Sequence, residues 1–188
     1  MRAAAVVLAA GASTRLGEPK QLVVLGGETL LERAVRVVRE AGCFPVVVVV
    51  GFEYVQVLGN CTLGDVVTVI NDRWSEGMAS SIRLGVGALG SVAKDTEGVL
   101  LMTCDQPSVT AKHLAQLMAE AKVKASRYAG RNGVPAFFPK KYFDKLMELK
   151  GDAGARSLLA MAPYQGLENG ELDVDTLEDL ERARGLFG

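Results

Sequence analysis

The fold of this chain is best deduced from the stretch Leu8-Ala9-Ala10-Gly11-Ala12-Ser13-Thr14-Arg15-Leu16-Gly17-Glu18-Pro19-Lys20. The apolar run Ala3 to Leu8 leads into it without alternation and predicts a strand buried on both faces. Gly11 and Gly17 allow close backbone approach and expose N–H groups, while Arg15 and Lys20 add positive charge. Ligands of open α/β sheets bind beyond the carboxyl ends of strands. The stretch therefore predicts a phosphate loop suited to a triphosphate.

The spacing of this loop excludes two better-known phosphate loops. A Walker A loop requires GxxxxGK[ST], whereas five residues separate Gly11 from Gly17 and Lys20 comes three residues later. A dinucleotide fingerprint requires GxGxxG, which Gly11-Ala12-Ser13 breaks. The alternative that stays open is an ordinary glycine-rich strand-to-helix turn with two solvated cations.

Strands and helices alternate on either side of this loop. The predicted strands are Ala3–Leu8, Pro45–Val50, Val66–Ile70, Gly98–Met102, Ser126–Ala129 and Pro135–Phe138. The predicted helices are Glu28–Ala41, Met78–Leu89, Thr110–Val123, Lys140–Leu149, Asp152–Ala160 and Leu177–Leu186. This alternation predicts an α/β fold with a mainly parallel sheet covered on both faces. Since no repeat, low-complexity tract or linker interrupts it, we expect residues 1–188 to form a single domain.

Composition narrows the class of protein. The chain has 188 residues, of which 49% are hydrophobic and 23% charged, with a formal net charge of −1. These values are ordinary for a globular protein and give no sign of a nucleic acid partner, which would favour a clustered basic face. No apolar run approaches the ~20 residues of a membrane span. The three cysteines form no CxxC pair, so a reducing, cytoplasmic location is expected.

Several short motifs, each weak alone, occur in an order that is a specific signal when taken together. The pattern LAAGxSxRxGxxK is followed by Asn71-x-x-Trp74-x-x-Gly77-Met78-x-Ser80-Ser81, Cys104-Asp105-Gln106-Pro107, Gly151-Asp152-x-Gly154-Ala155-Arg156 and Asp173-x-Asp175-Thr176. Over essentially the whole chain, this series resembles the MobA-like nucleotidyltransferases, and within them the molybdenum cofactor cytidylyltransferases. The resemblance implies a three-layer, Rossmann-like nucleotidyltransferase fold with a mixed, mainly parallel sheet. It also implies nucleotidyl transfer with release of pyrophosphate, and Mg²⁺ as cofactor.

The resemblance assigns roles to individual residues. Arg15, Lys20 and Asp105 would be catalytic. The nucleotide would be bound by Leu8, Ala9, Ala10, Gly11, Arg15, Lys20, Gly77 and Ser80, and the acceptor by Ser81, Asp152 and Arg156. From the residues alone, Ser80 and Ser81 are equally consistent with plain capping of a helix N-terminus.

Asp105 is the first candidate metal ligand. It follows a predicted strand and so lies at the same sheet edge as Gly11. By itself it is either a ligand of a hard cation or a turn aspartate that caps Val109 or Thr110. The resemblance favours the metal ligand.

Asp175 is the second candidate. Because it precedes Thr176-Leu177-Glu178-Asp179, it is also a candidate N-cap of the last helix. The resemblance assigns it to the metal and leaves Asp173 as a substitute ligand.

Other positions carry weaker expectations. Asp152 is expected to cap the helix that carries Arg156, and Arg156 either binds the acceptor phosphate or forms a structural salt bridge. His113, the only histidine, is expected at the surface of its helix. In Asn132-Gly133-Val134-Pro135, Val134 stands where the family has a histidine, which bears on the identity of the acceptor.

The leading hypothesis is transfer of a cytidylyl group from CTP to the phosphate of a molybdopterin-type cofactor. Ala10 supports CTP because the guanylyl-transferring branch more typically has glycine there, and the alanine methyl narrows the space for a base. The alternatives are another nucleotide or acceptor, a non-catalytic molybdopterin-binding chaperone, and a nicotinamide-dependent dehydrogenase, which the broken GxGxxG disfavours. The resemblance also allows transient contact with a molybdoenzyme.

Overall fold

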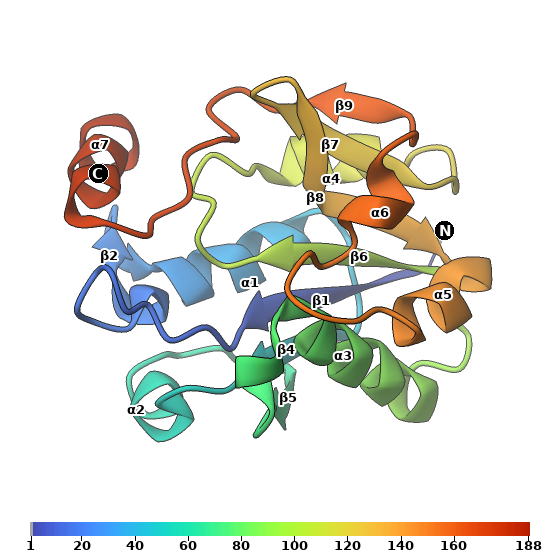
Figure 1. Ribbon diagram of the computed structural model, residues 1–188, viewed down its shortest axis with the longest axis horizontal. Coiled ribbons are helices and arrows are strands. Elements are labelled where there is room, and N and C mark those ends of the chain that lie inside the picture. The colour runs from blue at the N-terminus through green and yellow to red at the C-terminus, as the bar shows by residue number, and fades with distance from the viewer. Residues whose placement is uncertain (1) are drawn as a thin grey trace.

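A seven-stranded sheet forms the centre of the computed structural model, which describes residues 2–188 (Figure 1). In spatial order its strands are β5 (Val67–Ile70), β4 (Val46–Val50), β1 (Ala3–Ala9), β6 (Gly98–Thr103), β8 (Arg131–Pro139), β7 (Lys124–Tyr128) and β9 (Tyr164–Gly166). Only β8 runs antiparallel to its neighbours. The mainly parallel mixed sheet that the sequence predicts is therefore confirmed.

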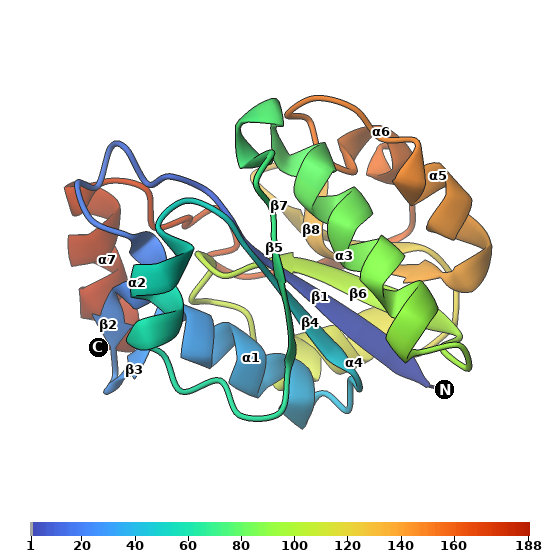
Figure 2. The same cartoon turned by 90° about the horizontal axis from the view of Figure 1, so that it is seen from below.

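Two helical layers cover this sheet (Figure 2). One consists of α1 (Leu30–Glu40) and α4 (Ala111–Met118), and the other of α3 (Met78–Val92), α5 (Phe143–Met147) and α6 (Arg156–Leu159). Alternate residues of β1 face opposite sides: Ala5 and Val7 pack with the first layer, Val6 and Leu8 with the second. This burial on both faces explains why β1 is apolar throughout.

A smaller apolar cluster lies at one end of the molecule, where α7 (Leu177–Phe187) packs against β2 (Val24–Leu25), which pairs with β3 (Glu28–Thr29) (Figure 1). Its buried members are Leu16, Val23, Leu25, Leu30, Leu172, Val174, Leu180 and Ala183. A capping box formed by Thr176 and Asp179 starts α7. The cluster joins the loop that follows β1 to the C-terminal segment.

Several element boundaries differ from those expected. The two short strands predicted near residues 126 and 135 form the longer hairpin β7–β8, and the helix predicted over Thr110–Val123 ends at Met118. The helix predicted over Lys140–Leu149 begins as a 3₁₀ turn at Lys140–Tyr142, the one predicted over Asp152–Ala160 covers only Arg156–Leu159, and β3 takes the first two residues of the helix predicted from Glu28. The short elements β2, β9 and α2 (Tyr54–Gly59) are additional, as are 3₁₀ turns at Lys20–Leu22 and Trp74–Glu76. Among residues 2–188, no helix is both long and apolar enough to cross a membrane.

Candidate active site

A cavity of about 480 Å³ opens at the carboxyl ends of β1 and β6, between the loop that follows β1 and the start of α3. Its volume suits a small-molecule ligand. Nine of the residues assigned to the site line it, namely Leu8, Ala9, Ala10, Gly11, Lys20, Gly77, Ser81, Asp105 and Asp152. Four others, Arg15, Ser80, Arg156 and Asp175, lie outside this lining.

Gln21 holds the phosphate loop in place. Its buried side-chain amide donates to the carbonyl oxygens of Ala9 at 2.7 Å and Gly11 at 3.1 Å. The backbone N–H of Lys20 donates to Ser13 Oγ at 3.0 Å. These bonds fix the loop across both of its ends. Gln21 was missed at the sequence level, because nothing in its pattern distinguishes a buried amide from a solvated one.

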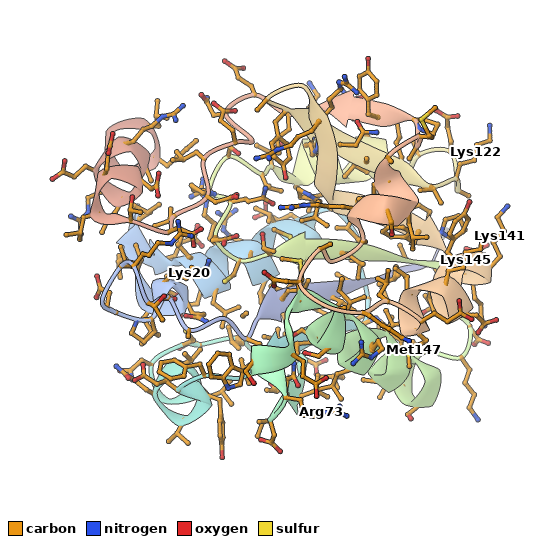
Figure 3. All side chains as sticks on the ribbon, viewed as in Figure 1. Lys20, Arg73, Lys122, Lys141, Lys145 and Met147 are labelled. Atoms are coloured by element: carbon orange, nitrogen blue, oxygen red, sulfur yellow. The ribbon has the colours of Figure 1, made fainter. Side chains whose placement is uncertain are left out.

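Lys20 lies between two carboxylates. Its Nζ donates to Asp105 Oδ2 at 2.5 Å and to Asp175 Oδ1 at 2.6 Å, and Arg15 donates to Asp175 Oδ2 at 3.0 Å. Figure 3 labels Lys20 beside the loop that follows β1. Burial disfavours the charge of Lys20, but hydrogen bonds and charge from Asp105 and Asp175 outweigh it and raise the pKa. The fold thus brings the two predicted metal ligands to one ammonium group.

The carboxylates fit a divalent cation. Asp105 Oδ1 and Asp173 Oδ1 are buried and have no hydrogen-bond partner among residues 2–188, an arrangement that costs free energy unless a donor or a cation joins it. Burial, followed by the charges of Asp105 and Asp175, raises the pKa of Asp173 to about 7. Within that range no group of three or more His, Cys, Asp or Glu side chains is arranged to hold a metal ion by itself. Mg²⁺ typically needs only one or two carboxylates besides substrate phosphates.

The capping alternatives for both aspartates are not realised. Thr110 is the N-cap of α4, and its side chain accepts from the N–H of His113. Thr176 likewise caps α7. Asp105 and Asp175 are therefore free of helix capping, and each directs one carboxylate oxygen at Lys20.

Ser80 and Ser81 both lie in the first turn of α3, which forms one wall of the cavity, but they face different surroundings. Asn71 Nδ2 donates to Ser80 Oγ at 2.9 Å and to Ser81 Oγ at 2.8 Å. Ser80 Oγ also lies 2.8 Å from the carbonyl oxygen of Gly77, so Ser80 supports the wall from behind, while Ser81 lines the cavity. Trp74, also in the lining, packs edge-on against Phe52 with ring centroids 5.3 Å apart.

The prediction that Asp152 caps the helix carrying Arg156 is wrong. That helix, α6, has Ala155 at its N-cap position and no side-chain cap bond. Asp152 Oδ1 instead lies 3.4 Å from the N–H of Met78, at the start of α3. The physical reason is close contact: a Cβ on Gly77 would lie 2.8 Å from the backbone of Gly151, so this loop is held against α3.

Arg156 is exposed and forms no ion pair among the described residues. The structural salt bridge considered for it is therefore absent from this part of the chain.

The expected surface position of His113 is wrong. The side chain is buried on the sheet side of α4, where Nε2 lies 2.7 Å from Ser126 Oγ. Ser126 Oγ donates in turn to the carbonyl oxygen of Pro135 at 2.6 Å. This chain of hydrogen bonds offsets the cost of burying a polar ring, and burial lowers the pKa of His113.

Comparison with known proteins agrees with this geometry. Residues 5–169 match the MobA-like NTP transferase domain. The chain belongs to the MobA-like NTP transferase family. It is accordingly a nucleotidyltransferase, and the resemblance inferred from its motifs is confirmed.

Curated relatives of this MobA-like protein carry diverse names. Nicotine blue oxidoreductase of Paenarthrobacter nicotinovorans is 31% identical over 94% of each chain. The 2-C-methyl-D-erythritol 4-phosphate cytidylyltransferase of Rhodococcus opacus is 33% identical over 86% of this chain and 69% of its own. A "probable molybdenum cofactor guanylyltransferase" of Opitutus terrae is 56% identical over 46 residues, or 24% of this chain and 23% of its own.

Solved structures support the same fold. Rv0371c of Mycobacterium tuberculosis superimposes with a TM-score of 0.86 at 31% identity, covering 98% of this chain and 97% of that one. A second structure of Rv0371c, in complex with manganese, has a TM-score of 0.80 at 29% identity and covers 99% and 100% of the two chains. A protein of this fold and similar sequence has thus been crystallised with manganese.

Proposed function

We propose that this MobA-like protein transfers a cytidylyl group from CTP to the terminal phosphate of a molybdopterin-type cofactor in the cytoplasm, with Mg²⁺, and releases pyrophosphate. One observation carries the proposal. The two cationic side chains of the phosphate loop, Arg15 and Lys20, form ion pairs with carboxylates from distant parts of the chain. These carboxylates belong to Asp105 and Asp175, and the cluster lies beside a cavity of small-molecule size. Charged triphosphate oxygens and a hard cation are the ligands that such a cluster would accept.

The triphosphate would be held by the loop between Gly11 and Lys20. Its backbone is fixed by Gln21 and Ser13, so its N–H groups need little reorganisation when an anion binds. Lys20 offers an ammonium group at the cavity wall, and Arg15, whose side chain is 69% exposed, adds charge from the solvent side.

Asp105 and Asp175 would hold the metal. A divalent cation bound there would offset negative charge that develops on the α-phosphate and on the departing pyrophosphate. The unpartnered Oδ1 of Asp105 is the oxygen best placed to gain from it.

The acceptor phosphate would attack the α-phosphorus in line. One P–O bond forms between acceptor oxygen and α-phosphorus, and the bond to the β-phosphate oxygen breaks, so pyrophosphate leaves with the electron pair. No protein base is required, because the acceptor phosphate is already ionised near neutral pH. This agrees with the position of His113, which is buried against Ser126. Ser81 and Asp152 in the wall, and the exposed Arg156, would orient the acceptor.

Pyrophosphate release with each of the four nucleoside triphosphates, plus a molybdopterin acceptor, tests the proposal. We expect turnover to require both CTP and the acceptor. Asp105→Ala should lower the rate by several orders of magnitude and leave the circular dichroism spectrum unchanged. A preference for GTP would overturn the cytidylyl assignment. Turnover that is absent, or that does not depend on the acceptor, would overturn the assignment of a molybdopterin-type acceptor.

Parallel assays separate this proposal from its rivals. A chaperone would bind the molybdopterin acceptor without releasing pyrophosphate. Because one relative is named an oxidoreductase, oxidation of NADH by this chain, with no pyrophosphate formed, would favour the dehydrogenase alternative.

A further inference from the structure

Lys20 already bonds one oxygen of each of the two carboxylates that the proposed function gives to a metal. Its Nζ donates hydrogen bonds to Oδ2 of Asp105 at 2.5 Å and to Oδ1 of Asp175 at 2.6 Å. The side chains of Lys20 and Asp105 are only 16% and 10% exposed, so water screens this triad poorly. A divalent cation that enters between Asp105 and Asp175 must compete with a fixed ammonium group of like charge.

The backbone of Lys20 is held by hydrogen bonds, whereas its ammonium group stands at the end of a flexible side chain. Bonds from Lys20 N to Ser13 Oγ and from Val23 N to Lys20 O hold the main chain. The flexible four-carbon stem lets Nζ rotate, and Lys20 also lines the cavity in which a triphosphate would lie. Phosphate oxygens there are an alternative partner for Nζ.

Arg15 cannot take the place of Lys20. Among residues 2–188 its one ion pair is with Asp175, at 3.0 Å, and its side chain is 69% exposed. Lys20 is the group that bridges both aspartates.

We propose that Lys20 bars a divalent cation from Asp105 and Asp175 until a triphosphate arrives and takes over its ammonium group. Metal and nucleotide then bind together, and the protein binds metal weakly when no nucleotide is present. This inference rests on the proposed function for the identity of the metal ligands, and adds an order of binding that the ligand set alone does not imply.

The binding of Mn²⁺ in the absence of nucleotide tests the inference. Electron paramagnetic resonance of free Mn²⁺ gives its affinity for wild type and for Lys20→Met, which keeps an unbranched side chain, one atom shorter, and removes its charge. We expect Lys20→Met to bind Mn²⁺ more tightly by about tenfold or more, since a repelling charge beside the site is lost. Added CTP should strengthen Mn²⁺ binding to wild type much more than to Lys20→Met.

Two further variants control the experiment. Lys140→Met removes a lysine whose Nζ, among residues 2–188, bonds only the carbonyl oxygen of Lys94, and it should leave Mn²⁺ affinity unchanged. Asp105→Asn, added to Lys20→Met, should abolish the gain. If Lys20→Met fails to fold, Lys20→Gln replaces it.

The possible outcomes separate this inference from the proposed function. Equal affinities of wild type and Lys20→Met, or a gain that survives Asp105→Asn, would overturn the inference even if CTP is turned over. Should GTP rather than CTP promote Mn²⁺ binding to wild type, the inference stands and the choice of CTP fails.

Discussion

Ala10 lies where β1 meets the phosphate loop, and its methyl group is part of the apolar cluster under α3. A Cβ on Gly51 would lie 2.9 Å from the Cβ of Ala10, which shows how closely the two segments approach. The carbonyl oxygen of Ala10 accepts from the N–H of Phe52 at 3.1 Å. We therefore expect Ala10 to influence nucleotide binding chiefly by fixing the position of the backbone that lines the cavity.

A glycine at position 10 should relax the choice of base. It removes the methyl group and frees the backbone, so a purine should be accommodated more easily. A methylene-sized change is typically worth ~1–3 kcal/mol of discrimination. We expect Ala10→Gly to raise kcat/KM for GTP relative to CTP by roughly tenfold or more. Ala12→Gly, the same change two residues further along the cavity wall, should leave the ratio unaltered. An unchanged ratio in both variants would remove Ala10 from base selection.

Residues that bear charge were easier to predict than those that support them. Lys20, Asp105 and Asp175 stand in short motifs at the ends of predicted elements, so their types and positions indicate chemistry directly. Gln21 and Asn71 act by hydrogen bonds to residues that the fold brings close, and such partners exist only after folding. For the same reason the predicted surface position of His113 was wrong, since its partner Ser126 lies on a different element.

At the scale of elements, Gly85 sets how closely α3 lies on the sheet. A Cβ there would lie 2.5 Å from Val6 Cγ1 and 3.0 Å from Val49 Cγ2. Val6 lies in β1 between β4 and β6, Val49 lies in β4, and both side chains are themselves fully buried, so neither can withdraw easily.

Replacing Gly85 by alanine should therefore destabilise the protein despite the better helix propensity of alanine. Overpacking a core usually costs about 1–3 kcal/mol. Gly90→Ala is the matched control, because it lies in the same helix with open space around its Cβ position; it should stabilise by about 0.4–1 kcal/mol. Urea unfolding gives both free energies. A Gly85→Ala protein as stable as Gly90→Ala would show that α3 can shift without cost.

Long buried elements were predicted better than short ones. The valine run of β4 is buried in full, and an apolar pattern of that length determines a strand without knowledge of its partners. By contrast, β2, β3 and β9 have two or three residues each, too few for any periodicity. The strands of the hairpin β7–β8 are longer than the apolar segments that predict them, because backbone pairing continues to Tyr128 and Arg131.

At the scale of the whole molecule, the site depends on contact between distant parts of the chain. The family match ends at residue 169, yet Asp175 lies beyond it. Leu172, Val174 and Leu180 share one apolar cluster with Leu16, which lies in the phosphate loop, and with Leu25, which follows the loop. This small cluster is separate from the two that cover the sheet, so we expect it to open as a cooperative unit of its own.

Leu180→Ala should therefore loosen the site before it unfolds the sheet. Leu180 is buried in the small cluster, and truncating a buried leucine typically costs about 2–5 kcal/mol. Hydrogen exchange should accelerate together in residues 12–25 and 170–183, while the amides of β1, β4 and β6 keep their protection. Because Asp175 then loses its fixed place beside Lys20, triphosphate binding should weaken in parallel. Leu117→Ala, a similar truncation in the cluster under α1 and α4, should lower global stability without this local pattern. Equal acceleration of all amides in Leu180→Ala would mean that the small cluster and the sheet unfold as one.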